Sequence, residues 1–157
     1  MATIAQSVNV ISPLMTSPTG LTKQTSYYAL YLFSKYMRGT SIAVHVRSGV
    51  YTGETYPEWV ASTCQVPKLD ASATVEDGWC NVAVVNIDAE KDLESEFKGV
   101  REGSEVQVYR IGGEGTALGD VNLAGKEMVG IREGRWDGRG GRFVFERHSF
   151  TLLRWKI

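Results

Sequence analysis

From residue 41 onward, apolar and polar residues alternate with the period of two that is typical of half-buried β-strands. Ile42, Val44 and Val46 alternate with other residues, and residues 79–87 form a continuous, mainly apolar run. Gly-rich or charged segments separate these runs, which predicts a mostly antiparallel β-sandwich or jelly roll. Residues 88–103 are polar and end on glycine, so we expect a long surface loop with one helical turn. The strands predicted here are 42–47, 69–75, 79–87, 105–111, 128–132, 142–147 and 149–155.

The first part of the chain follows a different pattern. Residues 8–14 are rich in β-branched side chains and predict a buried strand, and residues 16–20 carry turn residues. Thr25 or Ser26 can cap a helix that runs to about Met37, just before a glycine that ends it. This helix is apolar over most of its circumference, so one strand cannot cover it on every side. The segment therefore predicts one βα unit of a larger α/β body.

The length and composition of the chain are compatible with these two predicted parts, a βα unit over residues 1–40 and a β-sandwich over residues 41–157. The 157 residues are 43% hydrophobic and 22% charged, near the averages of globular domains. The formal net charge is −1, so the chain lacks the cationic field that non-specific nucleic-acid binding needs. No apolar run approaches the roughly 20 residues of a membrane-spanning helix, and the first residues do not resemble a signal peptide. We therefore expect neither a nucleic-acid nor a membrane partner, and the cellular compartment stays open.

Side chains that could bind metal or act as catalysts are few. Cys64, Cys80, His45 and His148 lack the close pairing that marks a zinc site, so we expect no metal and buried free thiols. A catalytic carboxylate pair needs a fixed separation and a partly desolvated member, whereas the densest carboxylates lie in a polar, lysine-containing segment. We therefore assign no catalytic residue in this chain. The carboxylates in question are Glu90, Asp92, Glu94 and Glu96.

Three further features of the sequence each suggest a function, but other details of the same segment argue against it. Residues 112–115 are rich in glycine but lack the spacing and the following helix of a dinucleotide-binding loop. Residues 132–147 interleave arginine, glycine and aromatic side chains, as single-strand nucleic-acid binders do, yet acidic residues partly neutralise them. Trp59 and Trp136 lie near turns and are the candidates for a sugar-stacking platform, although tryptophan in a sandwich more often packs in the core.

Three blocks near the start of the chain resemble a known family. They read AQSVNVISPLMT at 5–16, KQTSYY at 23–28 and SKYMRG at 34–39. With them, the chain resembles family-51 glycoside hydrolases, the α-L-arabinofuranosidases, over essentially its whole length. The closing residues 148–153 are similar to the end of that family's sandwich domain. Ala29 departs from the proline that many relatives carry after the tyrosine pair, which should alter only the start of the helix.

The resemblance implies a (β/α)8 barrel followed by a C-terminal jelly roll. Residues 1–40 would be the terminal strand–helix unit of a truncated barrel, and residues 41–157 the sandwich domain. The implied reaction is retaining hydrolysis of terminal α-L-arabinofuranosyl residues by two glutamates. Those glutamates lie upstream of the matching segment, so the chain alone is expected to be inactive. The implied substrates are arabinan, arabinoxylan or related oligosaccharides, and the implied reaction needs no metal or organic cofactor. The linkage preference and the oligomeric state, including a possible homo-oligomer, stay open.

Gln24 is the one residue expected to bind substrate. It follows the predicted strand and precedes the predicted helix, and in an α/β barrel such loops build the active site. Residues 15–24 are also long for a βα connection, which often marks a functional loop. The resemblance places a sugar-binding glutamine in the KQTSYY block. The alternative is a glutamine that bonds loop backbone; for the whole chain, the alternatives are a carbohydrate-binding module or a purely structural one.

Overall fold

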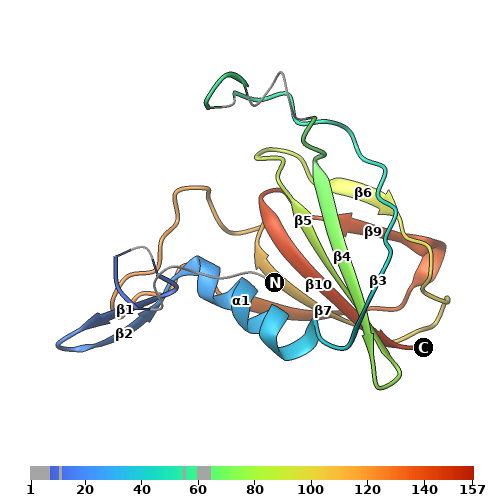
Figure 1. Ribbon diagram of the computed structural model, residues 1–157, viewed down its shortest axis with the longest axis horizontal. Helices are drawn as coiled ribbons and strands as arrows, with labels where there is room; N and C mark the ends of the chain where they lie inside the picture. Colours follow the sequence, from blue (N-terminus) through green and yellow to red (C-terminus); the bar gives the residue numbers. More distant parts are fainter. Residues whose placement is uncertain (1–7, 11, 55, 60–64) are drawn as a thin grey trace.

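The computed structural model describes residues 8–10, 12–54, 56–59 and 65–157. Its main feature is an antiparallel six-stranded sheet in the order β3-β4-β5-β10-β7-β8 (Figure 1). The predicted strands 69–75, 79–87, 105–111 and 149–155 are found as four central members of this sheet, shifted by no more than one residue at either end. The strands are β3 (Thr40–Ile42), β4 (Leu69–Glu76), β5 (Trp79–Asn86), β10 (Ser149–Lys156), β7 (Val106–Gly112) and β8 (Ile131–Trp136).

A second layer covers one face of this sheet and makes the domain a β-sandwich. It consists of the antiparallel pair β6 (Leu93–Glu96) and β9 (Arg142–Phe145), and a short 3₁₀ turn, η1 (Arg139–Gly141), leads into β9. Alternate residues of β5 and β10 enter the core between the layers, where they meet the phenylalanines of β9. The predicted mainly β fold is therefore confirmed. The buried residues of this core are Leu69, Ala73, Cys80, Val82, Val84, Val106, Val108, Phe143, Phe145, Leu153 and Trp155.

The opposite face of the sheet carries the helix α1 (Thr25–Tyr36). Tyr28 and Leu32 of the helix pack with Leu152 and Ile111 of the sheet and with Val129 of the β7–β8 loop. Strand β10 therefore serves both cores, because its successive side chains point to opposite faces of the sheet. The helix itself spans the predicted residues, but its N-cap is Gln24 rather than Thr25 or Ser26.

Of the strand predicted over residues 8–14, the described residues 8–10, 12 and 13 belong to no strand, residue 11 lies outside the described residues, and a hairpin begins at Leu14. Strands β1 (Leu14–Ser17) and β2 (Gly20–Lys23) pair across the predicted turn, and they lie at the far left of Figure 1. Asn9 and Val10 have positive φ angles of 63° and 62°, and the Asn9 carboxamide oxygen accepts a hydrogen bond from the Thr16 amide at 2.7 Å. An extended segment needs a neighbouring strand to pair its backbone groups. Here the described residues around position 9 form a turn that the Asn9 side chain holds.

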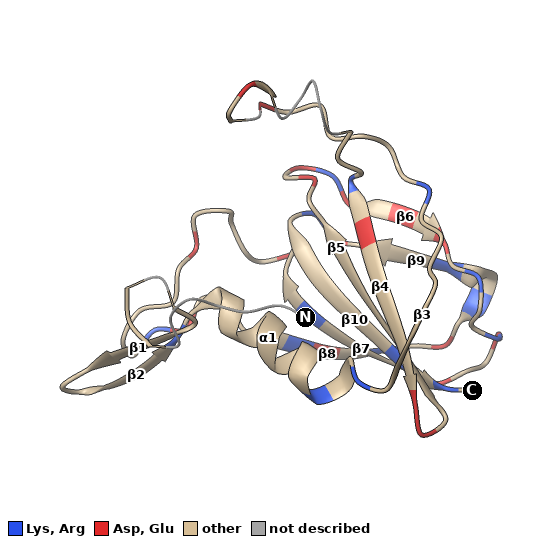
Figure 2. Ribbon diagram, in the orientation of Figure 1, with Lys and Arg blue, Asp and Glu red and all other residues tan. Residues whose placement is uncertain are grey.

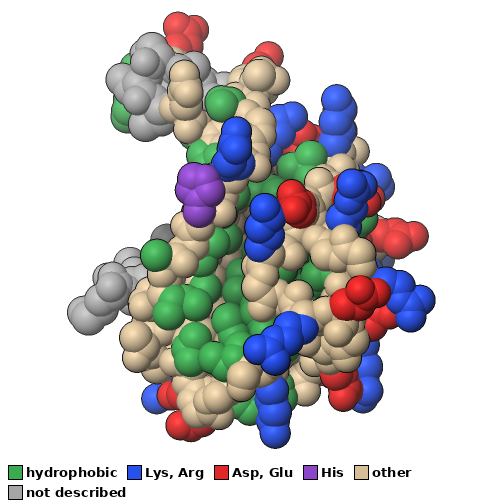
Figure 3. Space-filling view, turned by 90° about the vertical axis from the view of Figure 1, so that its right-hand side faces the viewer, with side chains coloured by type: hydrophobic (Ala, Val, Ile, Leu, Met, Phe, Trp, Pro, Cys, Tyr) green, Lys and Arg blue, Asp and Glu red, His purple; other side chains and the backbone are tan. Residues whose placement is uncertain are grey.

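Three other predictions at the edges of the sandwich are wrong. Strand β3 stops at Ile42, and residues 43–49 are irregular, with alternating apolar side chains left on the surface. Figure 3 shows the face of the molecule on which this irregular segment lies and the apolar side chains gathered there. Residues 93–96, predicted as loop, form β6 because β9 offers them a partner. Strand β8 begins at Ile131 instead of 128, because the amides of residues 128 and 129 bond the Asn122 side chain.

Candidate functional site

Gln24 lies where the hairpin joins the helix. Its backbone N–H donates to the carbonyl oxygen of Pro13 at 2.9 Å, and its own carbonyl oxygen accepts the amide of Tyr27 at 3.0 Å. These two bonds fix the direction of the chain as it leaves β2 and enters α1. The residue is extended, with φ of −72° and ψ of 164°, as an N-cap requires.

The Gln24 side chain makes no hydrogen bond within the part of the chain that the structure describes, and it does not cap the helix. Its amide keeps two donors and an acceptor oxygen for another group. The half-buried position allows such a group to approach from solvent. The loop-backbone hydrogen bond that the alternative predicts is not found among the described residues, and the predicted sugar contact stays a prediction.

Aromatic side chains surround the start of the helix. The Tyr27 and Tyr31 rings stack with centroids 6.2 Å apart, and the Lys23 ammonium lies 5.4 Å from the Tyr27 ring centroid. Tyr28 is buried; its burial and the nearby Glu127 carboxylate raise the pKa of its hydroxyl, which therefore stays protonated at neutral pH. The segment thus combines an unpaired amide with flat apolar surfaces.

The glycine-rich residues 112–115 form the base of the β7–β8 loop. The Glu146 carboxylate pairs with Arg132 at 2.6 Å and with Arg110 at 2.9 Å, and it accepts the Glu114 amide at 2.7 Å. Burial raises the pKa of Glu146, but these donors and charges outweigh it and leave the pKa below its usual value. Gly113 has a φ of 80° and lies against this carboxylate, so a side chain there would collide with it. The loop is held by an ion-pair cluster and has no phosphate-binding helix.

The carboxylates considered from sequence lie at the surface. Asp92 accepts the Arg147 amide at 2.9 Å, and Glu94 pairs with Arg142 at 3.4 Å. Glu90 and Glu96 are also exposed. The four side chains therefore lack the desolvation that a catalytic acid needs.

The cysteines and histidines lie apart from one another where they can be described. Cys80 is a buried free thiol, and burial raises its pKa. His148 contacts the carbonyl oxygens of Ala89 and Thr116 at 3.2 and 3.1 Å, whereas His45 is exposed. Cys64 lies outside the described residues. Among the residues described, no three His, Cys, Asp or Glu side chains gather as metal ligands.

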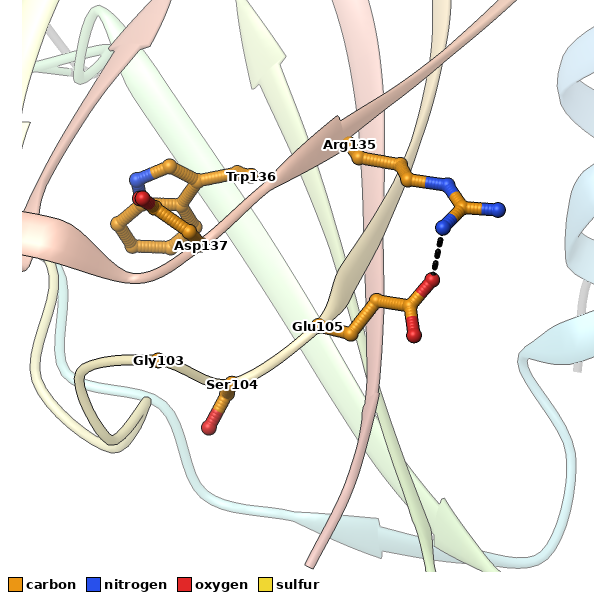
Figure 4. Close-up of a pocket in the computed structure, with 6 residues that line it drawn as sticks. All are labelled: Gly103, Ser104, Glu105, Arg135, Trp136 and Asp137. Atoms are coloured by element: carbon orange, nitrogen blue, oxygen red, sulfur yellow. Dashed lines mark hydrogen bonds and ion pairs between the residues drawn. The ribbon is translucent and has the colours of Figure 1, made fainter.

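The tryptophans that could stack on sugar differ in their surroundings. Trp136 meets Phe97 and Phe143 edge to face, with centroids 5.8 and 5.1 Å apart, so it packs against the sandwich core. Trp59 is 62% exposed in the long segment before β4. An open cavity of about 440 Å³ adjoins Trp136 and includes the ion pair between Glu105 and Arg135 (Figure 4). Its one aromatic ring is engaged with the core, which does not suit a stacking platform.

Positively and negatively charged residues lie on the same strands and loops of the sandwich (Figure 2). In the arginine-rich segment 132–147, Arg135, Arg139 and Arg142 each pair with a carboxylate. The positive charges that suggested single-strand binding are thus largely neutralised. Of the helices that the structure describes, none is long and apolar enough to cross a membrane.

A comparison with family models shows which protein family the chain belongs to. Residues 1–149 match the model described as alpha-L-arabinofuranosidase C-terminal domain. The chain belongs to this family. The resemblance seen in the three sequence blocks is therefore confirmed, and the matched residues cover the hairpin, the helix and the sandwich up to the start of β10.

Members of the arabinofuranosidase family are similar along the whole chain. The probable alpha-L-arabinofuranosidase C of Aspergillus clavatus is 54% identical over 99% of this chain, and the alpha-L-arabinofuranosidase C of Emericella nidulans is 51% identical over the same share. The chain spans 30% of the length of each of these relatives.

Solved structures share the fold at lower sequence identity. The alpha-L-arabinofuranosidase from Thermotoga maritima, described as an arabinose complex, matches with a TM-score of 0.78 and 21% identity. The match covers 98% of this chain and 33% of that one. The GH51 enzyme of Thermotoga petrophila gives a TM-score of 0.77 at 20% identity, covering 96% and 32%.

Proposed function

We propose that this chain acts as the C-terminal part of an α-L-arabinofuranosidase that hydrolyses terminal α-L-arabinofuranosyl residues. The observation that carries the proposal is the 54% identity, over 99% of the chain, to a probable α-L-arabinofuranosidase C. Residues 41–157 supply the sandwich domain, and residues 1–40 complete a barrel. The reaction proceeds with retention, using one glutamic acid as acid and base and a second glutamate as nucleophile. Neither glutamate belongs to this chain, whose role is to support the barrel and to contact substrate.

The exposed side of α1 supports the assignment of residues 1–40 to a barrel. Leu30 and Tyr31 are 38 and 40% exposed, although the helix already packs on the sheet through its other side. A helix that is apolar on two sides is suited to lie between two bodies. The second body in this proposal is the remainder of the barrel.

Gln24 is the residue through which this chain contacts the sugar. Its unpaired amide, its place at the start of α1 and the aromatic surfaces of Tyr27 and Tyr31 support this role. A carboxamide can donate to one sugar hydroxyl and accept from another, and such bonds can strengthen as the ring distorts in the transition state. Arabinan, arabinoxylan and their oligosaccharides are the substrates in this proposal, and no metal or organic cofactor takes part.

A chimaera tests the proposed function. In it, this chain replaces the matching 30% of the Aspergillus clavatus relative, and the same relative without that segment serves as the control. We expect the folded chimaera to hydrolyse an aryl α-L-arabinofuranoside with retention, as followed by absorbance and by NMR of the first sugar product. The control should be inactive. A folded, inactive chimaera beside an active intact relative would contradict the proposal.

A further inference from the structure

The loop between β7 and β8, residues 113–130, is longer than the roughly 12–15 residues beyond which loops without regular secondary structure are uncommon in compact domains. The Glu146 cluster anchors its first residues, and a two-bond bridge between Leu123 and Lys126 closes a tight turn near its middle. Val129, near its end, is buried with Tyr28 and Leu32 of the helix. The loop therefore reaches from the sandwich to the segment that carries Gln24.

Asn122 makes the polar contact between that loop and the hairpin. Its side chain is 2% exposed, and its oxygen accepts the amides of Met128 and Val129 at 2.8 Å each. Its nitrogen donates to the carbonyl oxygen of Val129 at 2.7 Å and to that of Lys23 at 2.9 Å. Two donated and two accepted bonds use the full capacity of a carboxamide. The bond to Lys23 joins residues 99 positions apart in the sequence.

The Lys23–Gln24 peptide group is consequently held from both sides. Its carbonyl oxygen, on Lys23, accepts from Asn122, and its N–H, on Gln24, donates to Pro13 at 2.9 Å. A peptide group is planar, so bonds at both of its ends fix the orientation of the whole plane. The Cα of Gln24 belongs to that plane, and its side chain starts there. One of the two bonds comes from the sandwich domain.

We propose that Asn122 is a positioning residue for Gln24, so that the β7–β8 loop of the sandwich sets the geometry of the sugar contact. This inference rests on the proposed function, in which Gln24 binds the arabinofuranosyl group. Asn122 itself is buried and does not touch the sugar. Misplacing a binding group by about 1 Å can lower a rate by roughly 100-fold, so an indirect contact of this kind can be measured in kinetics.

Two substitutions of Asn122 and one control substitution separate positioning from simple loss of stability. Asn122→Ala removes the carboxamide with all four of its hydrogen bonds. In Asn122→Asp, one oxygen can still accept from residues 128 and 129, but the second oxygen faces the carbonyl oxygens of Lys23 and Val129 and repels them. Asn86→Ala is the matched control, because Asn86 is equally buried and donates to three carbonyl oxygens, those of Lys91, Phe145 and Glu146. All three of these partners belong to the sandwich.

A double-mutant cycle in the chimaera tests the proposal. We expect Asn122→Ala to lower kcat/KM about 10-fold when Gln24 is present and less than about 2-fold when Gln24 is already alanine. Asn86→Ala should lower the melting temperature while leaving kcat/KM within about 2-fold. Equal losses from Asn122→Ala in both backgrounds would overturn the proposal. If Gln24→Ala alone leaves kcat/KM unchanged, the proposed sugar contact is wrong. The hydrogen-exchange measurement described next then tests separately whether Asn122 positions Gln24.

Hydrogen exchange on the full 157-residue chain tests the Asn122–Lys23 hydrogen bond without an activity measurement. The Gln24 amide donates to Pro13 and should exchange slowly in the wild type. We expect Asn122→Asp to speed exchange of the Gln24 amide at least about 10-fold. In Asn86→Ala, the exchange rate of this amide should stay within about 2-fold of the wild-type rate when both proteins are measured equally far below their melting temperatures. Unchanged exchange of the Gln24 amide in Asn122→Asp would overturn the proposal, even if the chimaera variant fails to fold.

Discussion

At the scale of single residues, Gln24 offers an unused carboxamide that can form several hydrogen bonds with a sugar. We expect Gln24→Ala in the chimaera to lower kcat/KM by the equivalent of about 1–3 kcal/mol of transition-state stabilisation. Because the side chain bonds nothing in the described chain, the free energy of unfolding should change by less than about 0.5 kcal/mol. Steady-state kinetics and urea unfolding measure the two quantities. Unchanged kinetics with unchanged folding would remove Gln24 from the substrate site.

The ion pair between Lys68 and Asp88 makes the stability of the fold depend on pH in the acid range. The Lys68 ammonium at 2.8 Å, together with the amides of residues 90 and 91, lowers the pKa of Asp88 from 3.8 to about 2. A lowered folded-state pKa means that the ionised pair stabilises the fold above about pH 4, and that this contribution is lost as the pH falls towards 2.

Lys68→Met removes the largest cause of that lowered pKa. We therefore expect wild type and Lys68→Met to differ most in free energy of unfolding above about pH 4 and to converge near pH 2. Urea titrations across this range measure the difference. A difference that stays constant with pH would show that the pair does not stabilise the fold through the Asp88 charge.

At the scale of elements, strand β10 joins the two cores of the molecule. Leu152 packs beneath α1, and its neighbour Leu153 packs between the two layers of the sandwich; both are fully buried. We expect Leu152→Ala and Leu153→Ala each to lower the free energy of unfolding by about 2–5 kcal/mol. Leu118→Ala, at a 71% exposed position, should change it by less than about 0.5 kcal/mol. Near-wild-type stability of Leu152→Ala would mean that the helix is not docked on the sheet.

The exposed side of α1 predicts association of the separate chain. Leu30 and Tyr31 leave an apolar surface exposed to water. We expect the purified chain to self-associate at high concentration in sedimentation velocity, and Leu30→Lys to reduce this association. Leu118→Lys, at a more exposed position outside the helix, should not. A monodisperse wild-type monomer at high concentration would contradict the assignment of this surface to a barrel contact.

The elements also show which patterns in a sequence determine structure. Strands β4, β5 and β10 follow the pattern because each has a partner on both sides and a buried face, so periodicity and pairing agree. Residues 43–47 alternate equally well but have no partner strand among the described residues, and they remain irregular. The β-branched run at 8–14 fails for a related reason, since Asn9 bonds Thr16 and turns the chain. A sequence pattern indicates which face a strand would bury, whereas the pairing depends on the surrounding fold.

At the scale of the whole molecule, the candidate site draws on parts that local sequence cannot connect. Gln24 could be named because the KQTSYY block resembles a family motif. Asn122 could not, because its role depends on one side-chain bond that spans 99 residues and on a loop with no regular structure. The sandwich, the hairpin and the helix together therefore form one support for the Lys23–Gln24 peptide group.

We propose that this chain supports a glycosidase without supplying its catalytic carboxylates. The most direct measurement is the turnover of an aryl α-L-arabinofuranoside by the highly purified 157-residue chain, at enzyme concentrations far above those used for an intact relative. We predict no hydrolysis above the buffer blank, because the described Glu90, Glu94 and Glu96 side chains are exposed and Glu146 is held ionised by two arginines. Turnover that is lost when one of the chain's own glutamates is replaced by glutamine would contradict this proposal.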